Sequence, residues 1–420
     1  MPQTLAQKIL QAHTDDVIER DGQIVQCRLS LVLANDITGP LAIKSFKGMG
    51  ASHVFDKDRI ALVMDHFTPQ KDIASANQVM ISRQFAREQG ITHYYEGGDC
   101  GVEHTLLPER GLVGPGDVVI GADSHTCTYG GIGAFATGMG STDIAAGMAL
   151  GETWIKVPPT IRVNINGRMS RWLRGKDLML LLIKTIGVDG ALYKALEFGG
   201  SVIDALPVEG RLTMANMAIE AGGKVGLFAV DELTRQYCAE HGRPGVTMSL
   251  AADEGAAYER VVDIDVTGQE PVVACPHLPS NVKNVSELKD LPVQQVVVGS
   301  CTNGRISDMR DAAEILRGRK VAKGVRCIIL PSPPAVWKQC LKEGLMDVFM
   351  DAGCIVGPCT CGPCLGGHMG ILGDGERAVA TTNRNFRGRM GSLDSEVYLS
   401  SPVVAAASAV AGCIAGPDQL

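Results

Sequence analysis

Cysteine is the residue type with the most distinctive spacing in this chain. Cys361 and Cys364 enclose a Gly-Pro pair, and Cys301 follows a short apolar run much earlier in the chain. The Gly-Pro turn places both sulfurs on one side, which core packing alone does not require. Three thiolates can hold a metal ion or cluster and leave one coordination position open, as a catalytic metal needs.

Spacing alone leaves four interpretations of these cysteines open. They are buried core residues, a thioredoxin-like redox dithiol at Cys361 and Cys364, a zinc site with His368 as fourth ligand, or an iron–sulfur cluster with one iron free. The redox interpretation is weaker than the two metal interpretations, because no Trp flanks the Cys361–Cys364 motif. Core burial is preferred for six other cysteines: Cys27, Cys127, Cys238, Cys327, Cys340 and Cys413.

Acid–base and anion-binding residues come directly after apolar runs of the kind that form buried strands. Such runs precede Asp65-His66, Asp123, Cys301 and Arg384. A histidine held by a carboxylate suits proton transfer near neutral pH, and arginine offers carboxylates a planar fork of donors. Because loops after parallel strands gather at one edge of a sheet, we expect these four loops to converge.

The apolar runs also predict the fold class. They alternate with helix-like segments along the whole chain, which indicates α/β architecture with parallel strands covered on both faces. Proline-rich seams at 157–160 and 275–279 divide the chain into three parts, 1–157, 158–284 and 285–420. Strands are expected at 30–34, 60–64, 118–120, 296–298, 327–330 and 378–381, and a helix begins after the Cys301 loop at Ile306.

Composition excludes several classes of protein. The 420 residues are 45% hydrophobic and 20% charged, which is typical of a folded chain and not of a disordered one. The net charge of −7, without a clustered basic face, argues against nucleic-acid binding. Residues 403–415 are apolar but too short to cross a bilayer, so we expect a buried helix there. The N-terminus lacks a signal-peptide pattern, and we expect a cytoplasmic protein with reduced cysteines.

Residues 131–136 match a nucleotide-binding motif only in part. They fit the loose GxGxxA dinucleotide fingerprint, but no strand directly precedes them. We therefore interpret them as a packing loop.

Four motifs, in order along the chain, resemble the aconitase superfamily. They are Gly121-Ala122-Asp123-Ser124-His125-Thr126, Ser300-Cys301-Thr302-Asn303, Cys361-Gly362-Pro363-Cys364 and Asn383-Arg384-Asn385-Phe386-Arg387-Gly388-Arg389. Within the superfamily, chain length and residues 364–370 resemble the branch of 3-isopropylmalate dehydratase and homoaconitase large subunits. The resemblance implies three layered α/β/α subdomains with mostly parallel sheets around a central iron–sulfur cluster, without the swivel domain of single-chain aconitases.

The resemblance also implies roles for individual residues. Cys301, Cys361 and Cys364 would bind one 4Fe-4S cluster, while Cys354 and Cys359 lie outside the ligand positions. The acid–base residues would be Asp65, His66, His104, His125 and Glu220. The substrate would contact Asp123, Ser124, Arg384, Arg389, Asn35 and Thr38. The cluster environment would include Asn216, Asn303 and Asn383, with Asn303 and Asn383 expected to donate hydrogen bonds to cluster sulfurs.

The activity that the resemblance implies is that of a hydro-lyase. Water leaves a 2-hydroxy acid and returns with the hydroxyl one carbon over, with isopropylmalate as the expected substrate and homocitrate as the alternative. Single-chain aconitases carry an additional domain that supplies a base serine, and no counterpart precedes Leu420. We therefore expect a separate small subunit, little turnover by this chain alone, and neither a nucleic-acid nor a membrane partner.

Overall fold

The first sheet of the computed structural model, which describes residues 1–420, has five parallel strands in the order β4-β3-β2-β5-β6. The central strands β2, β3 and β5 are buried along their whole length, which explains why they appear in the sequence as continuous apolar runs. The strands are β2 (Leu31–Asn35), β3 (Ile60–Val63), β4 (His93–Tyr95), β5 (Val118–Gly121) and β6 (Phe135–Gly138).

Helices and one short antiparallel pair accompany this sheet. Strands β1 (Ile24–Arg28) and β7 (Glu152–Lys156) pair with each other and form a separate ribbon. A capping box between Thr4 and Gln7 begins the first helix. The helical segments are α1 (Leu5–Gln11), α2 (Gly39–Gly48), η1 (Lys57–Arg59), α3 (Ile73–Gln89), η2 (Gly97–Asp99), α4 (Glu103–Glu109), η3 (Ser124–Ile132) and α5 (Ser141–Leu150).

The second sheet has four parallel strands in the order β10-β9-β8-β11. These are β8 (Thr160–Asn166), β9 (Ala195–Gly199), β10 (Val225–Phe228) and β11 (Arg260–Asp265). Its helical segments are α6 (Gly175–Ile186), α7 (Ser201–Asp204), α8 (Val208–Asn216), η4 (Met217–Ala221) and α9 (Glu232–Glu240).

The third sheet has seven strands in the order β13-β12-β18-β17-β14-β15-β16, in which β12 is antiparallel to both of its neighbours and all other pairings are parallel. The strands are β12 (Val272–Ala274), β13 (Val282–Asn284), β14 (Gln295–Gly299), β15 (Arg326–Leu330), β16 (Ile355–Val356), β17 (Arg377–Ala380) and β18 (Glu396–Leu399). The helical segments are η5 (Val285–Leu288), α10 (Ile306–Leu316), α11 (Pro334–Lys342), α12 (Leu345–Ala352), η6 (Gly362–Leu365), α13 (Pro402–Ala411) and η7 (Pro417–Gln419).

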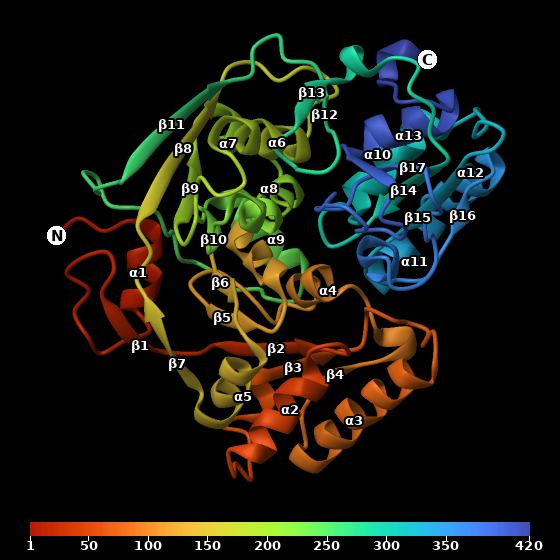
Figure 1. The fold of residues 1–420 in the computed structure, drawn as a ribbon. Coiled ribbons are helices and arrows are strands. Elements are labelled where there is room, and N and C mark those ends of the chain that lie inside the picture. The colour runs from red at the N-terminus through yellow and green to blue at the C-terminus, as the bar shows by residue number, and fades with distance from the viewer.

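The three sheets with their helices form three neighbouring α/β layers, coloured red to gold, yellow to green, and cyan to blue along the chain (Figure 1). The largest apolar cluster joins residues of the second and third sheets, including Ile161 and Val297. A second cluster joins the first sheet to Val225 and Leu227 of β10. The α/β class with mostly parallel sheets is therefore confirmed, and the layers share buried cores instead of standing apart.

The layers change close to the predicted seams, with one difference. Sheet membership passes from the first layer to the second between β7 and β8, beside residue 157. It passes from the second to the third between Asp265 and Val272, earlier than 284, because β12 and β13 reverse direction and join the edge of the third sheet. The division into domains at 157 and 284 stays a prediction.

Local predictions about packing can also be compared with the structure. The apolar C-terminal segment forms the buried helix α13, which ends at Ala411. The GxGxxA segment packs closely, because a side chain at Gly131 would meet the backbone of Leu212 at 2.6 Å. Only its middle is a loop, since Gly131 and Ile132 end η3 and Phe135 begins β6. None of the helices combines the length and the apolar character that crossing a membrane requires.

Candidate active site

Loops after strands of the first and third sheets open onto one cavity of about 180 Å³. Asp65 follows β3, Asp123 follows β5, Cys301 follows β14 and Arg384 follows β17. These four loops therefore converge, as expected for the carboxyl ends of parallel strands. The remaining lining residues are Ile37, His66, Val102, Glu103, His104, His125, Cys361, Cys364, Leu365, Asn383 and Arg389.

His66 is held by two carboxylates. Its Nδ1 lies 2.7 Å from Asp65 Oδ1 and 3.5 Å from Asp36 Oδ1. Asp36 also accepts hydrogen bonds from the backbone N–H groups of His66 and Phe67, at 3.0 and 2.9 Å. Burial lowers the pKa of His66, but Asp65 and Asp36 outweigh it, so that the net pKa is raised well above its ordinary value. The two carboxylates thus favour the charged form of the ring, whose Nδ1 is anchored by Asp65.

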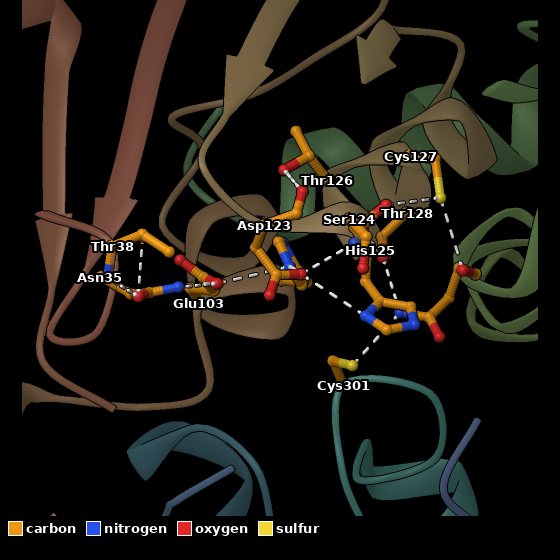
Figure 2. A network of polar contacts seen from close by, with 12 residues as sticks. Asn35, Thr38, Glu103, Asp123, Ser124, His125, Thr126, Cys127, Thr128 and Cys301 are labelled. Atoms are coloured by element: carbon orange, nitrogen blue, oxygen red, sulfur yellow. Dashed lines mark hydrogen bonds and ion pairs between the residues drawn. The ribbon is translucent and has the colours of Figure 1, made fainter. Parts of the chain in front are cut away.

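Asp123 connects two further histidines (Figure 2). Its Oδ1 accepts from His104 Nε2 at 2.9 Å and from the backbone N–H of His125 at 2.7 Å. The other ring nitrogen of His104, Nδ1, lies 3.1 Å from the Tyr129 hydroxyl. Burial raises the pKa of Asp123, but His104 and His125 overcome this and hold it well below its usual range. Asp123 is therefore an ionised carboxylate beside two imidazole rings.

Glu220 joins all three layers through its contacts. Its Oε1 lies 3.0 Å from His125 Nε2 and accepts a hydrogen bond from Arg384 Nε at 2.8 Å. Arg384 also donates from Nη2 to Ser124 Oγ at 3.0 Å. Burial lowers the pKa of His125, but its hydrogen bonds to the carboxylates of Asp123 and Glu220 raise it above its ordinary value. Arg384 is thus fixed in one orientation at the cavity wall before any ligand binds.

Amide and guanidinium groups donate to the cysteine sulfurs. Cys301 Sγ accepts from Asn216 Nδ2 at 3.3 Å and from Asn383 Nδ2 at 3.4 Å, while Arg389 Nη2 lies 3.6 Å from Cys364 Sγ. Cys301 lies at one end of the network in Figure 2. Burial raises the pKa of the Cys301 thiol to about 12. Donors aimed at a sulfur stabilise the thiolate form, which is the form that binds a metal.

The donor set favours one interpretation of the cysteines over the others. Cys301, Cys361 and Cys364 line the same cavity, so that the Cys361–Cys364 pair is not an isolated dithiol. His368 does not line the cavity, and its imidazole packs against Gly362 and Phe67. A fourth protein ligand from His368, as a zinc site would use, is therefore not provided. Three cysteines with amide donors and one open side fit a cluster that lacks a fourth protein ligand.

The other cysteines lie elsewhere. Cys354 is buried with Cys327 in the core of the third layer, and Cys359 lines a separate hollow beside Cys100. Cys413 is only partly buried, unlike the other five cysteines assigned to the core.

Several of the expected site residues support the cavity from behind. Asn35 and Thr38 do not line it, because Asn35 donates from Nδ2 to Glu103 and accepts from Thr38. Asn303 was expected to donate to a sulfur, but its amide instead donates to Asp308 at 2.9 Å and to Thr213 at 3.3 Å. The helix α10 begins so close to the loop that Asp308 takes up this amide, and a hydrogen bond from Asn303 to a cluster sulfur stays a prediction. Ser124, Asn216 and Glu220 also lie behind the lining residues.

Asn216 and Glu220 lie on two successive helical segments. α8 ends at Asn216, and residues Met217–Ala221 continue as the tighter segment η4. Asn216 still reaches Cys301 and Glu220 still reaches His125.

Three buried charged residues near the cavity were missed by the sequence analysis. Asp36 follows β2 as Asp65 follows β3, so its place after an apolar run was a usable signal. Glu103 precedes His104 and lines the cavity. Lys176 lies in the first turn of α6, and its buried Nζ donates to the backbone carbonyls of Thr381 and Thr382.

Comparison with known proteins agrees with this geometry. The sequence profile of the Aconitase family (aconitate hydratase) matches residues 7–290 and 281–412. The chain belongs to the aconitase family. Two curated relatives named "3-isopropylmalate dehydratase large subunit" cover the full length of both chains, from Desulfovibrio desulfuricans at 84% identity and Nitratidesulfovibrio vulgaris strain Miyazaki F at 72%.

More distant members match this aconitase-family chain over the same length. The large subunit of the same name from Acetivibrio thermocellus is 56% identical over 420 residues, covering all of both chains. Among solved structures, the holo-form of Thermococcus kodakaraensis aconitase X aligns at a TM-score of 0.49 and 14% identity, over 90% of this chain and 88% of that one.

Proposed function

We propose that this chain is the large, catalytic subunit of a 3-isopropylmalate dehydratase, which interconverts 2-isopropylmalate and 3-isopropylmalate by loss and return of water. The observation that carries the proposal is the convergence of Cys301, Cys361 and Cys364 with the Asp65–His66 pair on one cavity. Full-length relatives that carry this name favour isopropylmalate over homocitrate as the substrate.

A 4Fe-4S cluster is the cofactor that these cysteines would hold. Its one iron without a protein ligand supplies Lewis-acid chemistry toward the hydroxyl and carboxylate of the substrate when the cluster is bound. Asn216 and Asn383 donate to Cys301 Sγ, and this placement tunes the charge on the sulfur.

Water loss requires that one proton reach the leaving hydroxyl and that another leave the neighbouring carbon. We assign the first transfer to Nε2 of the His66 imidazolium, since its Nδ1 is fixed by Asp65 at 2.7 Å. Asp123 Oδ2 lies 3.9 Å from this Nε2 and favours the charged ring. We assign removal of the carbon-bound proton to a base of a separate small subunit, which the phrase "large subunit" in the names of the relatives favours.

Substrate carboxylates have two arginines available. Arg384 is oriented by Glu220 and Ser124, and Arg389 lines the same cavity beside Cys364. Guanidinium groups bind carboxylates through paired donors, and here they also offset the negative charge of the Asp65 and Asp123 carboxylates.

The cytoplasmic location stays a prediction.

The test is anaerobic reconstitution of the chain with iron, sulfide and its small subunit, followed by assay with isopropylmalate and homocitrate in parallel. Cys301→Ser, Cys361→Ser and Cys364→Ser should each abolish turnover and lose the brown colour. Cys359→Ser is the matched control, because it lies two residues from Cys361 but lines a different hollow, and it should retain both. Full activity in iron-free protein, or survival of Cys301→Ser alone, would contradict the proposal.

The partner is tested separately. The cluster-loaded chain without the small subunit should retain its absorbance but show little turnover. Turnover of the isolated chain at the full rate would exclude a required second subunit.

A further inference from the structure

Glu103 is a buried carboxyl group that lines the cavity and takes no part in the proton transfers assigned to His66 and to the small subunit. It is the first residue of α4, it is 1% exposed, and it lines the cavity with His66 and Asp123. Its backbone N–H donates to Asp65 Oδ2 at 2.8 Å, which fixes the start of the helix. A carboxyl group with so little access to solvent needs a stated partner for each oxygen.

One oxygen of Glu103 has a donor whose orientation is certain (Figure 2). Asn35 Oδ1 accepts from the backbone N–H groups of Ile37 and Thr38, both at 3.0 Å, and from Thr38 Oγ1 at 2.9 Å. Because three donors fix the Asn35 oxygen, its Nδ2 must face Glu103, and it donates to Oε1 at 3.0 Å. Oε1 is therefore the accepting oxygen of the carboxyl group.

The second oxygen, Oε2, is buried and has no hydrogen-bond partner within the chain. A buried carboxylate oxygen without a donor is costly, whereas a protonated oxygen can serve a ligand as a donor. The accepting role of Oε1 leaves Oε2 as the position for that proton.

The charges that face Glu103 come from several elements. Asp65 after β3 and Asp123 after β5 are negative, and the His66 imidazolium is positive. His104, on the same helix, lies 3.4 Å from Oε1 through Nε2, and Tyr129 of η3 faces the same group. Burial, then Asp65 and Asp123, raise the pKa of Glu103 well above its ordinary value, and His66 offsets only part of this.

We propose that Glu103 is a neutral carboxylic acid whose Oε2 hydroxyl donates a hydrogen bond to a carboxylate of the bound hydroxy acid. The proposal rests on the proposed function for the identity of the ligand. An ionised Glu103 would add a third carboxylate beside Asp65 and Asp123 and would repel an anionic substrate. The neutral acid instead adds a donor next to the arginines, and it discriminates for a carboxylate at that point of the cavity.

The protonation state can be tested without turnover. The infrared spectrum of the full-length chain at neutral pH should contain a protonated-carboxyl C=O band that is absent from Glu103→Gln. Glu232→Gln, an exposed glutamate at the start of α9, should leave the band unchanged. An identical spectrum for wild type and Glu103→Gln overturns the proposal, whether or not the enzyme isomerises isopropylmalate.

The hydrogen bond to substrate is tested in the reconstituted two-subunit enzyme. Glu103→Gln replaces Oε2 by an amide donor of the same shape, so KM and kcat should stay within a few-fold of wild type. Glu103→Leu removes the donor and should raise KM about 10- to 100-fold, the size of one hydrogen bond to a charged group, with a smaller effect on kcat.

Two kinetic outcomes would overturn the proposal for Glu103. If Glu103→Gln is as damaging as Glu103→Leu, the ionised carboxylate is the active form. If Glu103→Leu leaves KM unchanged and lowers only the thermal midpoint, the residue is merely structural. Wild-type enzyme that fails to convert isopropylmalate would contradict the proposed function and leave the infrared result standing by itself.

Discussion

The side chain of Lys176 is fully buried, and its ammonium group lies behind the cysteine site. Its Nζ donates to the carbonyl of Thr381 at 3.0 Å and to that of Thr382. These residues directly precede Asn383, which donates to Cys301 Sγ. Burial lowers the pKa of Lys176 from 10.5 to about 8, while Cys364 and Cys301 act in the opposite direction.

The substitution Lys176→Met separates the effect on the fold from the effect on the site. Loss of two hydrogen bonds from a charged donor costs about 3 to 6 kcal/mol in total, at about 1.5 to 3 kcal/mol each. Removing the buried charge returns about 3 kcal/mol, since the pKa of the ammonium is lowered by about 2.5 units at about 1.4 kcal/mol per unit. The cluster-free chain should therefore lose only about 0 to 3 kcal/mol of its free energy of unfolding.

The cluster-bound chain should be destabilised more than the cluster-free chain. In it the thiolates of Cys301 and Cys364 are anionic, and Lys176→Met removes the cation near them. We expect thermal unfolding of the cluster-free variant to change little, while the reconstituted variant releases iron to a chelator clearly faster than wild type. Lys184→Met is the control, because Lys184 is exposed on the same helix, and it should match wild type in both assays. Iron release at the wild-type rate from Lys176→Met would refute the electrostatic reasoning, and a large loss of stability in the cluster-free chain would refute the energy balance.

Two further substitutions probe the cavity wall. Asp65→Asn should lower the pKa of His66, as measured by NMR titration of histidine-labelled protein; an unchanged titration would contradict the assignment. Because the native pKa of His66 is raised above the unfolded value of 6.5, the charged pair stabilises the fold fully below that pH, and the difference in unfolding free energy between wild type and Asp65→Asn should shrink as pH rises through the native pKa. Arg384→Lys keeps the charge but cannot reach both Glu220 and Ser124, so KM should rise about tenfold or more, whereas the exposed Arg387→Lys should not change it. Equal effects of the two lysine variants would show that charge alone suffices.

The elements that deliver the site were predictable from sequence because parallel strands buried on both faces leave a simple trace. The runs at β3, β5, β14 and β17 are continuous and apolar, and each ends at a polar or sulfur-bearing residue. The convergence of their loops follows from the geometry of a parallel sheet. The cysteine spacing left a three-sulfur site as one of four interpretations, and the resemblance to the aconitase superfamily implied it; the structure places Cys301, Cys361 and Cys364 on one cavity.

The residues that sequence could not place depend on contacts between distant segments. Lys176 resembles an ordinary solvated lysine in a first helical turn, and it is buried only because the loop after β17 packs over it. Asn303 lies in the cysteine motif, yet Asp308 competes for its amide at the start of α10. Asn35 was predicted to contact the substrate, and in the structure its amide donates to Glu103, which is itself buried. In each case the residue type was visible, but the partner was not.

Asp65 contacts both the Cys361 turn and the proton donor His66, the first through its backbone carbonyl and the second through its carboxylate. The carbonyl oxygen of Asp65 accepts from Thr360 Oγ1 at 2.8 Å and from the backbone N–H of Cys361 at 3.0 Å. Asp65 also anchors His66 through Oδ1 and the start of α4 through Oδ2. A direct hydrogen bond therefore joins the Cys361 turn to the residue that anchors His66. The first layer contributes the acid and the third contributes the sulfur, but their relative position is set by direct hydrogen bonds and not by the sheets alone.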